Sequence, residues 1–119
     1  KIKLWKEKKI KQFDYLNKQH GSLPAKAYPG RAAILIKLLG LNMSHIFATF
    51  EKTNSKKIGN YIPGTKIPIL SDKNLKKKIN TKVPIINLAW HIPSEIKKYL
   101  RAHKIKNRII NIIDKNDFI

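Results

Sequence analysis

Cysteine is absent from the 119-residue chain. This absence excludes disulfide bonds, thiolate catalysis and zinc or iron–sulfur sites built on cysteine. No apolar run approaches the roughly 18 residues that a membrane-spanning helix needs, and the first residues lack the apolar centre of a signal peptide. We therefore expect no membrane span. The lack of cysteine is compatible with the reducing cytoplasm, where we expect the protein.

Acidic residues are scarce, with 7 against 26 basic ones, so the net charge is +19. One interpretation is a polyanionic partner, such as nucleic acid, an anionic membrane surface or a phosphate-rich ligand. The other is compositional drift, because Lys, Ile and Asn, which have A/T-rich codons, supply 53 residues. Only 3 of the basic residues are arginine, the side chain on which base recognition relies most. Nucleic acid is therefore the less favoured partner.

The length leaves room for one domain with one hydrophobic core. The chain begins with Lys1 rather than methionine, which fits a segment of a longer protein. Trp5, Phe13 and Leu16 follow a loose helical spacing that stops at Gly21. We expect residues 1–20 to form a helix or a connector from a missing upstream domain, and residues 21–119 to form the domain.

Strand and helix patterns alternate along the rest of the chain. Strands are predicted at 23–27, 45–50, 67–70, 84–89 and 108–113, and helices at 2–19, 31–39 and 93–104. This alternation indicates an α/β fold in three layers, with a mostly parallel sheet of about five strands and helices on both faces. Helix 31–39 is apolar on nearly every side and is expected to be buried.

The first strand–helix turn contains Gly30 and Arg31. A glycine loop before a helix offers free backbone N–H groups and the positive end of the helix dipole, and Arg31 adds a charge. These features predict a phosphate cradle. The full G-x-G-x-x-G pattern is absent, with Ala25 and Ala27 at positions where glycine is usual. The alternative is a simple turn, with Gly30 serving only backbone geometry.

Three further residues follow predicted strands. Glu51 lies 21 residues after Gly30, where an acid often holds a ribose hydroxyl; alternatively it only balances lysines. Trp90 and His91 end a central strand, where ligands gather in open sheets, although tryptophan there often packs in a core. We propose Gly30, Arg31, Glu51, Trp90 and His91 as candidate substrate-binding residues. No catalytic residue and no metal ligand are identified, because no histidine pair has metal-ligand spacing.

Three segments carry a family resemblance. Residues 29–41, PGRAAILIKLLGL, resemble the GASGR…LLNYLGL segment of sugar C-methyltransferases. Residues 57–69, KIGNYIPGTKIPI, are similar to their KxGxYxPGTxIPI segment, and residues 88–96, LAWHIPSEI, to LAWNxxxEI. The three occur in the right order and at about the right spacing, over roughly residues 23–113.

The resemblance implies a C-methyltransferase that depends on S-adenosylmethionine and acts on nucleotide-linked deoxysugars. Such enzymes carry a zinc-binding N-terminal segment, a methyltransferase domain and a C-terminal Rossmann-like domain, and only the last is similar to this chain. The implied function is a non-catalytic substrate-binding or scaffold domain. Its implied partners are an upstream methyltransferase domain of the same chain and a nucleotide-linked sugar, and S-adenosylmethionine belongs to the parent protein rather than to this fragment.

Two other functions remain open. One is a basic nucleic-acid-binding module, which the scattered aromatic residues and the few arginines disfavour. The other is a stand-alone Rossmann-like domain that binds a nucleotide, which the missing paired glycines disfavour.

Overall fold

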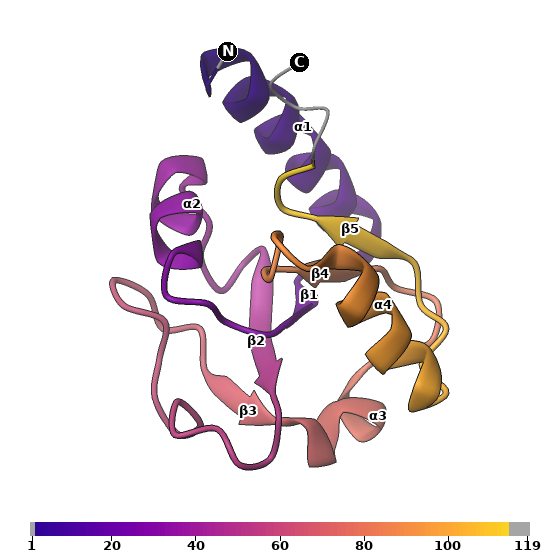
Figure 1. Ribbon diagram of the computed structural model, residues 1–119. Helices are drawn as coiled ribbons and strands as arrows, with labels where there is room; N and C mark the ends of the chain where they lie inside the picture. The colour runs from indigo at the N-terminus through magenta and orange to yellow at the C-terminus, as the bar shows by residue number, and fades with distance from the viewer. Residues whose placement is uncertain (1, 115–119) are drawn as a thin grey trace.

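The computed structural model describes residues 2–114, and the last part of the expected domain, residues 115–119, lies outside the described residues (Figure 1). The five predicted strands and the three predicted helices are all present. In chain order the elements are α1 (Ile2–His20), β1 (Leu23–Lys26), α2 (Ala32–Leu39), β2 (Ile46–Glu51), β3 (Ile69–Ser71), the 3₁₀ helix η1 (Asp72–Asn74), α3 (Leu75–Lys78), β4 (Ile85–Asn87), α4 (Pro93–Ala102) and β5 (Ile109–Asn111).

The strands form one sheet in the order β3-β2-β1-β4-β5. Every strand pairing in it is parallel, so the predicted α/β fold is confirmed. This order is that of the first five strands of Rossmann sheets, which bind ligands where the strand order reverses. The reversal lies at β1, which pairs with β2 on one side and with β4 on the other. The carboxyl ends of these three strands therefore define the edge of the sheet where a ligand is expected.

The two strands after α3 are shorter than predicted. β4 ends at Asn87, whose side-chain oxygen accepts a 2.9 Å hydrogen bond from the Ala89 amide. The Asn87 amide group also donates a 2.8 Å bond to the Asn111 side chain at the end of β5. Because the asparagine side chain turns the following backbone, the apolar run through Ala89 does not continue the strand.

Helices cover both faces of the sheet, as predicted. The α1/α2 face is covered by α1, α2 and the segment around residues 62–67, and the α3/α4 face is covered by α3 and α4 (Figure 1). Each face has its own apolar cluster. Buried members include Phe13, Leu16, Ala25, Ile36, Ile46, Ile62 and Ile86 on the α1/α2 face, and Ala48, Phe50, Leu75, Ile85, Ile96, Leu100 and Ile105 on the α3/α4 face.

Helix α1 packs into this core. Its buried side chains Trp5, Phe13 and Leu16 belong to the cluster of the α1/α2 face. The Trp5 indole nitrogen donates a 3.3 Å hydrogen bond to the Ile112 carbonyl just beyond β5. The buried Lys9 ammonium donates a 2.7 Å bond to the Asn111 carbonyl. Within the described residues, α1 is thus part of the same packed unit as the sheet; its expected role as a connector stays a prediction.

Helix α2 is only half buried, so the prediction that it is buried all round is wrong. Ala32, Ile36 and Leu39 face the sheet, whereas the Ile34 side chain is 63% exposed and that of Leu38 is 41% exposed. A helix packed on one face of a sheet covers one stripe of its surface and leaves the opposite stripe free. The helix ends at Leu39, as predicted, and Gly40 (φ 63°) follows it in a left-handed conformation that suits glycine.

Candidate functional site

The turn that leaves β1 is held against β2. Ala27 adopts φ 68°, a left-handed conformation that glycine adopts more easily than alanine. Its N–H donates a 2.7 Å hydrogen bond to the Phe50 carbonyl, and its carbonyl accepts a bond from the Thr49 hydroxyl. Alanine therefore stands at a position whose geometry favours glycine, and the carboxyl ends of β1 and β2 are held together.

Lys57 joins the loop after β1 to the end of β2. Its ammonium donates a hydrogen bond to the Tyr28 carbonyl, lies 3.9 Å from a Glu51 carboxylate oxygen and lies 5.4 Å from the centre of the Tyr28 ring. The Ser55 hydroxyl donates a 3.4 Å bond to the same carboxylate oxygen. The structure thus brings Glu51 and the 28–31 loop together. The Tyr28 ring packs into the core, and burial raises the pKa of its hydroxyl.

Gly30 and Arg31 are exposed at the start of α2. Arg31 occupies the N-cap position, and its side chain makes no capping hydrogen bond. The first amides of the helix are already engaged: Ala32 donates to the Pro29 carbonyl at 2.9 Å, Ala33 to Gly30 at 3.4 Å and Ile34 to Arg31 at 3.2 Å. The amides of residues 32–34 are therefore not among the free N–H groups expected at this turn. Anion recognition here would depend on the Arg31 guanidinium and the helix dipole.

Trp90 and His91 follow β4, the neighbour of β1. The Trp90 ring packs against the same apolar cluster as Tyr28, and His91 is exposed beside it, with ring centres 5.8 Å apart and nearly perpendicular planes. The Trp90 indole nitrogen is buried and has no hydrogen-bond partner among residues 2–114. The structure thus places both residues at the predicted edge of the sheet, with Trp90 partly in the core.

A buried ion pair lies on the α3/α4 face at the same edge. The Lys26 side chain is 2% exposed, and its ammonium lies 2.9 Å from an Asp72 carboxylate oxygen and 3.1 Å from the Phe50 carbonyl. The Tyr99 hydroxyl donates a 2.6 Å hydrogen bond to Asp72, and its ring centre lies 4.8 Å from the Lys26 ammonium. Burial raises the pKa of Tyr99, and the hydrogen bond to Asp72 and its negative charge raise it further.

Sequence reasoning missed Lys57, Lys26, Asp72 and Tyr99. Lys57 appeared only as part of the 57–69 segment, and Tyr99 only as a residue within the helix predicted at 93–104. A usable signal existed for Lys26, which is the single charge within the short strand predicted at 23–27. Its partner, 46 residues further on, has no such signal, because only the strand order brings the ends of β1 and β3 within reach.

The charged side chains at this edge differ in whether they already have a partner. Among the described residues no group of three or more His, Cys, Asp or Glu side chains could hold a metal ion. Glu51 and Asp72 each already face a lysine. Arg31 and His91 are exposed and available to a ligand.

The chain matches the model of a known protein family. The model of the family described as C-methyltransferase C-terminal domain matches residues 1–113. The chain belongs to this family. The match confirms the resemblance, and the matched residues include those of α1. A search of curated proteins gives no match for this C-methyltransferase C-terminal domain. Among its described helices, none has the length and apolar character needed to cross a membrane.

Proposed function

We propose that this C-methyltransferase C-terminal domain binds a nucleotide-linked sugar and serves as a scaffold for an upstream methyltransferase domain, without being catalytic itself. Family membership supplies the methyltransferase context. The observation that carries the binding role is the Lys57 bridge, which fixes the 28–31 loop beside Glu51 at the sheet edge where ligands bind. The proposed setting is the cytoplasm.

The proposed contacts follow from the chemistry of each side chain. The Arg31 guanidinium is an exposed cation at a helix start and would pair with the diphosphate. The Glu51 carboxylate would accept a hydrogen bond from a sugar hydroxyl. Gly30 would allow close approach, since among the described residues other than its chain neighbours no heavy atom lies within 4 Å of the place where its Cβ would stand. Trp90 and His91 would border the sugar ring on the β4 side.

The contacts at the first strand–helix turn of this domain disfavour S-adenosylmethionine there. A cofactor lying along such a turn needs backbone N–H donors, and the amides of residues 32–34 are already bonded to carbonyls of residues 29–31. The Tyr28 ring also lies beside this turn, with 7% exposure. We therefore place the methyl donor on another domain of the parent protein and assign no methyl-transfer step to these residues.

A titration tests the proposed site. UDP-glucose, used as a representative nucleotide sugar, is added to the ¹⁵N-labelled chain, and amide shifts are expected at residues 28–32, 51 and 89–92. Because one charge-assisted hydrogen bond contributes about 1.5–3 kcal/mol, Arg31→Ala should weaken binding roughly ten- to a hundredfold. Arg108→Ala, which removes an equally exposed arginine before β5, is the matched control. Unchanged affinity in Arg31→Ala would contradict the site.

Two further ligands separate this proposal from its alternatives. S-adenosylmethionine should give no saturable shifts, and micromolar binding of it would overturn its placement on another domain. UDP binding as tightly as UDP-glucose would favour a stand-alone nucleotide-binding domain.

Nucleic acid remains the alternative partner, because the net charge is +19. Diffuse lysine charge gives affinity by counterion release without sequence discrimination. Two duplexes of different sequence should therefore bind equally weakly and dissociate at physiological salt, as measured by fluorescence anisotropy. Tight, sequence-selective binding at that salt concentration would replace the sugar-binding proposal.

A further inference from the structure

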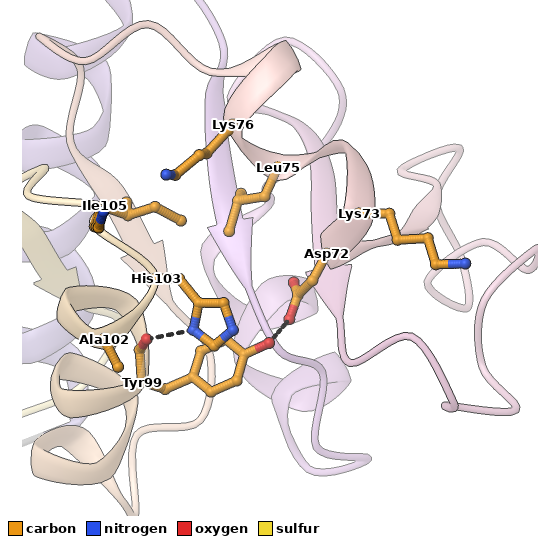
Figure 2. Close-up of a pocket in the computed structure, with 9 residues that line it drawn as sticks. Asp72, Lys73, Leu75, Lys76, Tyr99, Ala102, His103 and Ile105 are labelled. Atoms are coloured by element: carbon orange, nitrogen blue, oxygen red, sulfur yellow. Dashed lines mark hydrogen bonds between the residues drawn. The ribbon is translucent and has the colours of Figure 1, made fainter.

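A separate hollow lies between η1–α3 and the end of α4, on the α3/α4 face. Its volume is about 410 Å³, which is within the range of small-molecule sites, roughly 300–1,000 Å³. Leu75, Ala102 and Ile105 form apolar parts of its lining, and Tyr99 and His103 contribute aromatic rings (Figure 2). None of the candidate residues of the proposed sugar site lines this hollow. We name it the α3–α4 pocket.

The charge around the α3–α4 pocket is one-sided. Lys73, Lys76 and Lys104 line it, and within residues 2–114 none of them forms an ion pair or a side-chain hydrogen bond. Asp72 is the one acidic residue in the lining, and Lys26 and Tyr99 already engage its carboxylate. A partly enclosed site with unpaired cations and a neutralised acid attracts an anion.

The aromatic wall defines the shape of the ligand. The His103 ring stacks on the Tyr99 ring with centres 4.2 Å apart and planes tilted by 32°. Figure 2 shows the two rings together at the pocket, with His103 Nδ1 directed at the Tyr99 carbonyl, 2.8 Å away. The Tyr99 hydroxyl is fixed by Asp72, so the inner ring is held in place. An exposed ring stacked on a fixed one offers a flat surface on which a planar ligand can lie.

The pocket continues into a second hollow of about 410 Å³, which shares Lys76, Lys104 and Ile105 with it. The continuation adds Ile79 and Lys106, so its lining is again apolar and basic. A ligand larger than a single ring therefore has room to extend along the groove.

We propose that the α3–α4 pocket binds a small planar aromatic anion, its ring stacked beside His103 and its negative group held by Lys76 and Lys104. This ligand chemistry has two sources, a nucleoside monophosphate and an aromatic carboxylate. The proposal does not depend on the sugar-binding proposal, because the two sites share no residue.

AMP and 2-naphthoate serve as the two test ligands, one for each source. Either is added to the ¹⁵N-labelled chain, and saturable amide shifts are expected at residues 72–76 and 102–106 with submillimolar affinity. Saturation by AMP alone identifies the nucleotide source, and saturation by 2-naphthoate alone identifies the carboxylate source. The uncharged 2-naphthol should bind about tenfold more weakly than 2-naphthoate, because it lacks the charge that the lysines attract.

Two sets of variants separate stacking from charge. His103→Ala should weaken binding about tenfold, as expected for the loss of one stacked ring, and His103→Phe should restore it. His20→Ala, at the exposed end of α1, is the matched control and should change nothing. The double variant Lys76→Gln/Lys104→Gln should weaken binding of the anions but not of 2-naphthol, whereas Lys97→Gln/Lys98→Gln on the exposed side of α4 should leave both unchanged.

Several results would overturn the pocket. The proposal fails if neither ligand saturates, if the shifts spread over the surface lysines, or if they gather at residues 28–31 and 89–92. Equal loss of affinity in both lysine double variants would show that general charge, not the pocket, attracts the ligand. A normal amide spectrum of each free variant establishes that it has folded, and the Phe variant keeps the stacking test valid should His103→Ala unfold.

Discussion

The two faces of the sheet are packed by different means. On the α1/α2 face, Ile36 of α2 and Phe13 of α1 lie in a cluster of apolar side chains. On the α3/α4 face, the apolar cluster surrounds the Lys26–Asp72 ion pair, to which Tyr99 of α4 is hydrogen-bonded. Apolar contacts are non-directional, so many arrangements satisfy them. An ion pair requires one geometry, and we infer that it fixes η1 and α4 relative to β1.

Breaking the ion pair should have the largest effect. Asp72→Ala leaves the buried Lys26 ammonium with the Phe50 carbonyl and the face of the Tyr99 ring but without a counter-charge, and we expect a loss of about 3–5 kcal/mol in the free energy of unfolding. Urea denaturation measures it. Replacing both partners, in Lys26→Met/Asp72→Leu, should cost clearly less than Asp72→Ala, because no uncompensated charge stays buried. Asp14→Ala, an exposed carboxylate on α1, is the control and should cost under about 0.5 kcal/mol.

On the α1/α2 face, the loss in the free energy of unfolding should increase with the buried side-chain volume that a substitution removes. Ile36→Ala opens a cavity under α2 and should cost about 2–4 kcal/mol. Ile34→Ala, on the exposed stripe of the same helix, should cost about 0.5 kcal/mol or less. Equal losses in the two variants would show that α2 is buried on both sides in solution.

Removing the Tyr99 hydroxyl should perturb the α3/α4 face less than removing the Asp72 carboxylate. Tyr99→Phe removes one hydrogen bond to Asp72 and should cost about 1–2 kcal/mol near neutral pH. The folded pKa of Tyr99 is raised above the unfolded value, so its stabilisation is complete below pH of about 10 and is lost as pH rises through the folded pKa. The wild-type chain should therefore lose stability with increasing pH above about 10, and Tyr99→Phe should lose less over the same range. Parallel pH profiles for the two chains would contradict this assignment.

The smallest effect is expected where the two faces meet, at the end of β1. Ala27→Gly relieves a left-handed conformation that costs an alanine about 1–2 kcal/mol, and the greater freedom of glycine in the unfolded chain offsets about 0.5–1 of it. A net gain of about 0.5 kcal/mol should appear as a small rise in Tm. Ala25→Gly, in the fully buried centre of β1, should instead lower Tm.

The fold was predictable because its signals are local. Each helix or strand is indicated by residues within that element, as in the apolar runs of β2 and β4, the apolar spacing of α4 and the glycine that follows α2. The alternation of strands and helices then indicates a parallel sheet. The degree of burial of α2 was mispredicted, since an apolar sequence does not say whether another layer covers its outer side. At the candidate site, the sequence placed Glu51 and Arg31 at the same edge of the sheet, but the hydrogen bonds of the α2 amides required coordinates.

By itself, the sequence determined the class of the protein: a cysteine-free α/β domain of the C-methyltransferase C-terminal family, with a net charge of +19. Only the tertiary structure decided which charged side chains pair with one another in the core. Asp72 lies 46 residues after Lys26, and Tyr99 lies 27 residues after Asp72, so no sequence periodicity connects them. From the sequence, each of the three could equally have been an exposed side chain. The strand order β3-β2-β1-β4-β5 and the packing of α4 on the sheet bring them into one buried cluster. Local propensity specifies the individual helices and strands, whereas the pairing of buried charges depends on how those helices and strands pack against one another.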